Sequence, residues 1–260
     1  MEEIVLKKLE LNKVLTSVAG YASLDETKRQ IVSLRPSVTL SEAEALLQLS
    51  AEADTALFRY GVGHIEVFPL LDDELERARK GAALSCGELL AVAALLRSAR
   101  VAYRSIQGLP EEYSVHLREI ASGIYFDEVL ERDILEKIIG EDEVSDYASD
   151  ALFDIRRSIR SLNERAKLSE YLSGEGAKYL QDAIVTMRDN RYVLPVRAEH
   201  KTKIRGFVHD RSASGATFFI EPEQILDMNN ELRELAVAEK EEIERILAQL
   251  SHRVGTMAES

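Results

Sequence analysis

Apolar residues recur at alternating steps of four and three in two separate stretches of the chain. The steps join Ala148, Leu152, Ile155, Ile159, Leu162 and Ala166 in the first stretch, and Leu232, Ala236, Glu239, Ile243, Ile246 and Leu250 in the second. This spacing is typical of a coiled-coil seam and predicts two long helices, over about 145–173 and 223–256. We expect them to fold back on each other as an antiparallel arm, with two ordinary bundle helices as the alternative. Glu239 interrupts the seam and is expected to face a basic side chain.

Between these helices the apolar pattern changes to a period of two, which is typical of strands. The expected strands cover 183–187, 192–196, 204–209 and 216–220. Asp189 and Asn190 lie between the first two and suit the tight turn of a hairpin. Pro195 has no amide to donate to a neighbouring strand, so we expect it at an edge or a bulge. The insert is therefore predicted to be a small antiparallel sheet of four strands.

The first part of the chain is predicted to be a series of helices separated by short turns that contain glycine or proline. The helices are expected over about 10–20, 24–34, 41–59, 70–80, 86–106, 112–121 and 127–139. Three of them begin at a capping box, in which a serine accepts from the amide three residues on and a glutamate reaches back to the serine amide. The boxes start at Ser23, Ser41 and Ser85.

These patterns predict a mainly α fold: a helical core, then a long antiparallel helical arm that carries a small antiparallel β-sheet at its tip. The expected divisions are a core over 1–140, an outgoing helix within 141–182, a β-rich region over 183–222 and a returning helix over 223–260. The composition favours this class, because 30% of the residues are charged, only 6% are aromatic and none is Trp.

Charge is distributed unevenly along the chain. The formal net charge is −13, yet residues 188–211 contain seven Lys and Arg against three acids. The other 236 residues carry 26 bases against 43 acids, a net charge of −17, while the short segment has +4. A uniformly acidic surface repels nucleic acid, so any contact with a polyanion has to be local.

The basic segment supplies the candidate binding site. Alternation along the strands places Arg191 on one face of its strand and Lys203 and Arg205 on one face of the next, so we expect the three to share an outward face. Lys201 and His200 are expected in the loop between them. Phosphate contacts need little more than this, and the alternative is a solvated face that keeps a sheet edge soluble. The candidate nucleic-acid-binding residues are Arg188, Arg191, Arg197, His200, Lys201, Lys203, Arg205 and Arg211.

Catalytic and metal sites find little support in the sequence. His209, Asp210 and the serines that follow offer the residue types of a hydrolase triad, but neighbouring strand residues point to opposite faces. Asp146, Asp150 and Asp154 recur every four residues with no histidine nearby, which a solvated face or pairing with bases explains better than a metal. The chain contains no GxxxxGK[S/T] phosphate-binding loop. We therefore expect no catalytic residue, cofactor or metal in these 260 residues.

Several long strings of the chain resemble one family. RYVLPV, HDRSASGATFFIEP and NNELREL, in and after the basic segment, resemble the bacterial MutS-II family, the MutS paralogue without the mismatch-reading domain. The opening LKKLELNKVLTSVAGYASLDETKRQI and the later GAALSCGELLAVAALLRSARVAY are similar to the N-terminal half of the same family. The resemblance spans essentially the whole chain.

The resemblance implies a core, a lever helix, a clamp and a returning lever helix, which in the family lead into an ABC-type ATPase domain and a small nuclease-like domain. We expect a fragment that ends before any Walker motif, with ATP and Mg bound by the parent protein. The family implies a homodimeric ATPase and endonuclease that binds branched DNA, suppresses homologous recombination and splits stalled or collided ribosomes. The fragment is then expected to be a non-catalytic clamp on DNA or ribosomal RNA. The roles of its basic residues rest on their charge.

The alternative function is a protein-interaction or dimerisation scaffold, in which the arm holds a partner without direct contact to nucleic acid. A single cysteine, Cys86, excludes an internal disulfide, so a reducing, cytoplasmic setting is expected. No stretch of about 18 apolar residues occurs and the N-terminus lacks an apolar signal region, so neither membrane insertion nor export is expected.

Overall fold

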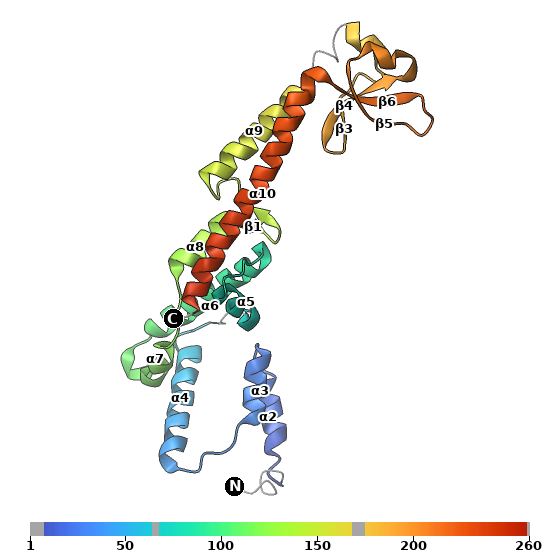
Figure 1. Cartoon of the computed structure of the whole chain (residues 1–260). Helices are drawn as coiled ribbons and strands as arrows, with labels where there is room; N and C mark the ends of the chain where they lie inside the picture. Colours follow the sequence, from blue (N-terminus) through green and yellow to red (C-terminus); the bar gives the residue numbers. More distant parts are fainter. Residues whose placement is uncertain (1–7, 64–67, 168–174, 259–260) are drawn as a thin grey trace. The chain divides into compact units, whose positions relative to one another are not determined.

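The computed structural model describes residues 8–63, 68–167 and 175–258 (Figure 1). The described residues are mainly helical, as predicted, with one four-stranded and one two-stranded antiparallel sheet. The chain divides into two compact units, one formed by Met1–Glu76 and Gly87–Leu135 and the other by Arg77–Cys86 and Glu136–Ser260. The division into core, outgoing helix, β-rich region and returning helix stays a prediction.

The helices of the first unit agree with the predicted ranges to within a few residues. They are α2 (Leu11–Ala19), α3 (Asp25–Ser33), α4 (Leu40–Phe58), most of α5 (Asp72–Arg79), α6 (Cys86–Gln107), the short η1 (Glu111–Tyr113), α7 (Val115–Ala121) and most of α8 (Glu128–Lys137). Leu89 and Val92 of α6 and Leu130 of α8 are fully buried. The buried Glu131 accepts from Arg100 Nε and Nη2, both at 2.8 Å, which ties α8 to α6.

Two of the three predicted capping boxes are wrong. Thr39, and not Ser41, caps α4, because Thr39 Oγ1 accepts from the amide of Glu42 at 3.3 Å and the serine is already inside the first turn. α3 begins directly after Leu24, with no side-chain cap, so the box at Ser23 does not form. α6 begins directly after Ser85, as the third box predicts.

In the second unit, α9 (Asp150–Lys167) and α10 (Glu223–Met257) lie side by side and antiparallel, and together they are called the arm here (Figure 1). Glu239, on the predicted seam of α10, accepts from Arg156 Nε of α9 at 2.7 Å, which confirms the expected basic partner. α9 begins at Asp150 and not near 145, because Ser149 Oγ accepts from the amide of Leu152 and caps the helix. Its predicted end near 173 lies outside the described residues.

The predicted seam agrees only in part with the buried face of the arm. Leu152, Leu162 and Ala166 of α9 and Ile246 and Leu250 of α10 are at most 5% exposed. Ala236, which the pattern placed on the seam, is exposed. A helix has 3.6 residues per turn, so a stripe repeating every 3.5 residues drifts around a straight helix by about 20° per heptad. The contact therefore leaves the predicted stripe within one helix.

Segments before the arm pack against the C-terminal half of α10. The amide of Leu84 donates to Ser251 Oγ at 2.8 Å, and both residues are buried. Gly255 lies so close to the backbone that an added Cβ would be 2.5 Å from Ala78 O, so this helix position requires glycine. A short hairpin of β1 (Ile138–Gly140) and β2 (Glu143–Val144) lies between α8 and α9 and was not predicted.

The sequence between α9 and α10 forms the predicted antiparallel sheet, in the order β3-β4-β6-β5. Its parts are η3 (Glu175–Tyr179), β3 (Thr186–Arg188), β4 (Arg191–Arg197), η4 (Ala198–Lys203), β5 (Gly206–Arg211) and β6 (Thr217–Pro222). Asp189 and Asn190 form the tight β3–β4 turn with φ of 49° and 59°. Gln181 N donates to Pro195 O at 2.7 Å, so the side of Pro195 without an amide faces away from β6, beyond the end of β3.

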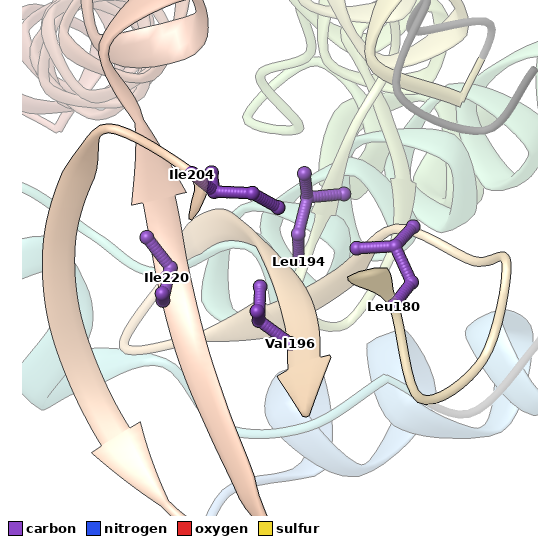
Figure 2. Close-up of a cluster of buried hydrophobic side chains, with 5 residues drawn as sticks. All are labelled: Leu180, Leu194, Val196, Ile204 and Ile220. Carbon is purple, nitrogen blue, oxygen red and sulfur yellow. The ribbon is translucent and has the colours of Figure 1, made fainter. Parts of the chain in front are cut away.

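One face of this sheet carries a small apolar core (Figure 2). Leu194 and Val196 of β4 and Ile220 of β6 meet Leu180 and Ile204, which come from the segments before β3 and after η4. All five are at most 6% exposed. Tyr179, Val185 and Phe218 pack against this cluster and are only partly buried. The sheet therefore has its own core, which holds the basic residues around it in place.

Candidate nucleic-acid interface

The eight predicted binding residues fall into three groups by their contacts. Exposed side chains with no ion-pair partner among the described residues are those of Arg197, Lys203 and Arg205. Side chains over a phenylalanine ring are those of Arg188, Lys201 and Arg211. Side chains bonded or packed against other groups of the sheet region are those of Arg191 and His200.

Arg197, Lys203 and Arg205 follow one another around the connection between β4 and β5. Arg197 ends β4, Lys203 ends η4, and Arg205 comes directly before β5. Ile204 lies between the last two and is 6% exposed in the apolar core. Because this residue is anchored inward, its two basic neighbours are held at the surface. Three positive charges without an ion-pair partner in the described part of the chain therefore lie along one short connection.

Phe218 extends this basic surface toward the β5–β6 loop. Lys201 Nζ lies 4.5 Å from the centre of its ring and Arg211 Cζ lies 5.3 Å from it. The ring packs on the apolar core, so it provides a fixed platform for the two cations. A cation over an aromatic ring at an exposed site is worth about 0.5–1 kcal/mol, which orients the charge without neutralising it. Lys201 and Arg211 thus remain available to an anion.

Arg188 and His200 are more constrained. Arg188 Cζ lies 4.1 Å from the centre of the Phe219 ring, and Arg188 Nε is 3.5 Å from a carboxylate oxygen of Asp210. The His200 ring meets Tyr179 edge-on, with 5.2 Å between centroids. Both side chains are half-buried. Their surroundings favour contact with nucleic acid less than those of the exposed group.

The expected outward face shared by Arg191, Lys203 and Arg205 is wrong for Arg191. Arg191 Nη1 donates to Glu221 Oε1, and its Nη2 donates to the side chain of Asn230 at 2.8 Å. Both faces of β4 are covered, because each residue from 192 to 196 is buried. Because both faces of the strand are covered, alternation does not separate an inner from an outer face.

Glu221 is the acceptor around which this part of the molecule is built. It is 1% exposed, and it accepts from Asn229 Nδ2 at 2.7 Å and from His209 Nε2 at 2.5 Å in addition to Arg191. Burial by itself raises the pKa of Glu221, but the hydrogen bonds from Asn229, His209 and Arg191 together hold it below the usual value. The carboxylate is therefore ionised, and the proton on His209 Nε2 points at it.

Asn229 connects the sheet to the arm. Its Oδ1 accepts from Tyr192 N at 2.9 Å and its Nδ2 donates to Tyr192 O at 3.0 Å, as a neighbouring strand would. The hydroxyl of Tyr192 lies 2.9 Å from Asn163 Oδ1 of α9. Tyr192 also packs with Ala166 and Ile225, one from each helix of the arm. The sheet is thus docked on both arm helices through one residue of β4.

Glu221 and Asn229 were not predicted from the sequence. A signal was present in each case: Glu221 is an acid in the mainly apolar string TFFIEP, and Asn229 begins a pair of asparagines inside a long helix. A charge in a strand that is apolar on both faces predicts a buried partner. That partner, Arg191, is 30 residues away in the sequence, so its identity requires the fold.

The residues that resemble a hydrolase triad are not assembled as one. His209 is bonded to Glu221 and not to a serine. Ser212 Oγ accepts from the amide of Thr217 at 3.1 Å, and Ser212 O accepts from Gly215 N at 2.8 Å, so this serine stabilises the turn. Asp146 lies before α9 and accepts from Arg156 and Arg160, which is pairing with bases. Residues 8–63, 68–167 and 175–258 contain no cluster of three or more His, Cys, Asp and Glu that could hold a metal ion.

Comparison with known proteins identifies relatives of the whole chain. It is 39% identical to Endonuclease MutS2 of Clostridioides difficile, 41% to Endonuclease MutS2 of Agathobacter rectalis and 40% to Endonuclease MutS2 of Clostridium beijerinckii. The matches cover 99–100% of this chain and 33% of each relative, so the chain spans about one third of their length. No protein-family model matches the chain. The relatives support its assignment to a part of a MutS2-family protein.

No helix in the described part of the chain combines the length and the apolar character that a membrane span needs.

Proposed function

We propose that the four-stranded sheet is a nucleic-acid clamp of a MutS2-type protein and contacts the sugar-phosphate backbone. The observation that carries this proposal is a group of exposed basic side chains without ion-pair partners among the described residues. They are those of Arg197, Lys203 and Arg205. Lys201 and Arg211, over the Phe218 ring, add two oriented charges beside it. Backbone contacts of this kind position a protein on nucleic acid and carry no sequence information.

The distribution of charge supports a nucleic acid over an acidic protein as the ligand. The whole chain has a net charge of −13, so most of it repels either kind of partner. Nucleic acid has a much higher linear charge density than a folded acidic protein, and it releases condensed counterions when Lys and Arg side chains bind it. A small basic surface on an acidic protein therefore gains most from a polyanion of that kind.

The resemblance and the names of the relatives extend the proposal to the parent protein. A homodimeric MutS2-type ATPase and endonuclease would carry this chain as its core, lever and clamp, and would bind ATP and Mg outside it. Branched DNA and stalled or collided ribosomes are the proposed ligands. The arm joins the sheet through Tyr192 and Asn229, so a movement of α10 would be passed to the clamp as a rigid displacement.

A binding experiment on the 260-residue chain tests the proposal. The affinity for a four-way DNA junction, for ribosomal RNA and for intact ribosomes is measured by fluorescence anisotropy over a salt series. We expect weak binding whose logarithm falls linearly with the logarithm of the salt concentration. The triple variant Lys201→Glu, Lys203→Glu and Arg205→Glu should bind at least tenfold more weakly and with a smaller salt slope, since up to three phosphate contacts are lost.

A matched control reverses the charge of three exposed basic side chains of the arm and so changes the net charge by the same amount. Its substitutions are Arg157→Glu, Arg233→Glu and Lys240→Glu. We expect it to reduce affinity much less than the triple variant of the sheet. Equal losses in the two variants would show that only net charge matters and would remove the clamp from the binding surface. Self-association of the chain without any affinity for nucleic acid would favour the scaffold function instead.

A further inference from the structure

Phe207 differs from the other phenylalanines of the sheet. It is 59% exposed on β5, which is an edge strand in the order β3-β4-β6-β5. The rings of Phe218 and Phe219 are covered by cations of the same chain, whereas no ring or cation contact of Phe207 occurs within the described residues. Val208, the next residue, is also 44% exposed, so β5 presents apolar side chains on both of its faces. This edge of the sheet therefore has an aromatic ring with a free face.

Arg205, a cation of the binding group without an ion-pair partner among the described residues, lies on the chain two residues before that ring. The amide of Glu223 donates to Arg205 O at 3.2 Å, so the extended backbone of β5 continues back to Arg205. Alternate residues of a strand share a face and lie about 7 Å apart, which puts Arg205 and Phe207 side by side. Gly206 between them approaches β6 so closely that an added Cβ would be 2.0 Å from Glu221 O. The backbone therefore fixes the spacing of the cation and the ring.

We propose that Phe207 stacks on an unpaired base while Arg205 contacts a phosphate of the same strand. A guanidinium and an aromatic ring on alternate residues of one extended strand lie on the same face, and they can reach the two chemically different ends of one nucleotide. Stacking on an aromatic ring tolerates every base, because each has a π-face. Bases inside a duplex are already stacked and offer no free face, so the ligand has to contain unpaired nucleotides, as junctions, loops and strand ends do. The proposal rests on the proposed nucleic-acid function and narrows its ligand class.

The chain contains no tryptophan, which provides a direct test. The variant Phe207→Trp has a single indole at the proposed stacking position. Its emission should be quenched on binding a DNA duplex with a single-stranded overhang, and much less on binding a blunt duplex of equal total length. The same pair of probes in RNA distinguishes the two kinds of nucleic acid. Val237→Trp, at an exposed position of α10, is the control fluorophore and should show no quenching.

Affinity supplies a second readout that does not depend on the new indole. Phe207→Ala should weaken binding to the overhang by roughly 5-fold to 150-fold, which corresponds to the loss of one base–aromatic stack. Its salt slope should stay that of the unmutated chain, because no charge is removed. Phe207→Leu keeps apolar bulk without a ring and should lose nearly as much affinity as the alanine variant.

The outcomes separate the two proposals. If the unmutated chain binds none of the probes, the nucleic-acid function and this inference are both wrong. If it binds and Phe207→Ala leaves the affinity for the overhang unchanged, with no quenching of Phe207→Trp, the clamp stands and the stacking inference is overturned. Equal quenching by blunt and overhanging duplexes would also overturn it, since the preference for unpaired bases would be absent.

Discussion

At the scale of single residues, the most consequential side chain is Glu221. It is a buried carboxylate that accepts from Arg191 of β4, His209 of β5 and Asn229 of α10, so it joins two strands and a helix to its own strand. A buried ion pair stabilises a protein little relative to an apolar substitute, but removing one partner leaves an unsatisfied group at a high cost. Glu221 therefore secures the geometry by which the sheet meets the arm.

Replacing Glu221 by glutamine should destabilise the chain by about 2–3 kcal/mol, because the Arg191 charge loses its counter-ion and one nitrogen donor then faces His209 or Arg191. The free energy of unfolding in urea measures the effect. Asp210→Asn is the matched control, since it removes a 52% exposed carboxylate of the same sheet whose contact with Arg188 spans 3.5 Å. We expect the control to cost less than about 0.5 kcal/mol, as exposed ion pairs contribute little.

The difference in stability between the unmutated chain and Glu221→Gln should depend on pH. The folded pKa of Glu221 lies below its ordinary value of 4.5, so its contribution to stability is present above about pH 4.5 and is lost as the pH falls through the folded pKa. The difference in stability between the unmutated chain and Glu221→Gln should thus be largest near neutral pH and shrink in acid. A difference that grows below pH 4.5 would contradict this assignment of charge.

The position of Arg191 explains why the candidate site was only partly predictable. Charge and alternation identified the basic segment, Lys203 and Arg205 are exposed as expected, and the candidate Arg197 is exposed as well. Nothing local distinguishes Arg191 from them, because the carboxylate that binds it is supplied by β6, which follows η4, β5 and the β5–β6 loop. Pairing between strands distant in sequence decides which basic side chains are neutralised. Alternation predicts one exposed face, and this prediction fails for a strand covered on both faces.

At the scale of elements, the arm depends on a narrow apolar contact between α9 and α10. Ile246 is 2% exposed within it, while Ile159 on the opposite helix is only half-buried. The seam pattern predicts the same burial for these two positions, but their exposures differ. A charge at the first has to be buried, whereas a charge at the second can reach water at the rim of the contact.

Ile246→Glu should therefore cost about 3–5 kcal/mol and Ile159→Glu about 1–2 kcal/mol, since the loss combines apolar burial with the desolvation of a charge. Urea unfolding followed by circular dichroism measures both. Val237→Glu, at a 54% exposed position of α10, should change stability by less than about 0.5 kcal/mol. Equal, small effects at Ile246 and Val237 would mean that α10 does not pack on α9 as described.

Elements with a strong period were predicted well, and those without one were not. The two arm helices and the hairpin turn at Asp189 and Asn190 follow from patterns of 3.5 and 2 and from residues that tolerate positive φ. The hairpin of β1 and β2 has too few residues to show a period. The hydrogen bond from Leu84 to Ser251 joins residues that are 167 positions apart, and no local pattern predicts such a contact.

At the scale of the whole molecule, the basic segment has to act against the field of its own chain. Residues outside 188–211 carry a net charge of −17, and α10, which leads away from the sheet, exposes several glutamates. Repulsion between these carboxylates and a bound polyanion extends over roughly the Debye length, which is about 10 Å at 0.1 M salt and longer at lower salt. The acidic residues should thus weaken binding without touching the ligand, and they should confine it to the sheet.

This effect can be measured on the arm itself. The triple variant Glu231→Gln, Glu234→Gln and Glu241→Gln neutralises three exposed carboxylates of α10 while leaving the sheet and the apolar contact intact. We expect its affinity for a DNA junction to rise about two- to threefold at 50 mM salt, as through-solvent repulsion is small per charge, and to match the unmutated chain at 500 mM, where screening is nearly complete. The slope of the salt dependence should become steeper by a corresponding amount. A gain that persists at high salt would instead mean that nucleic acid contacts α10 directly, and the binding surface would then have to extend from the sheet onto the arm.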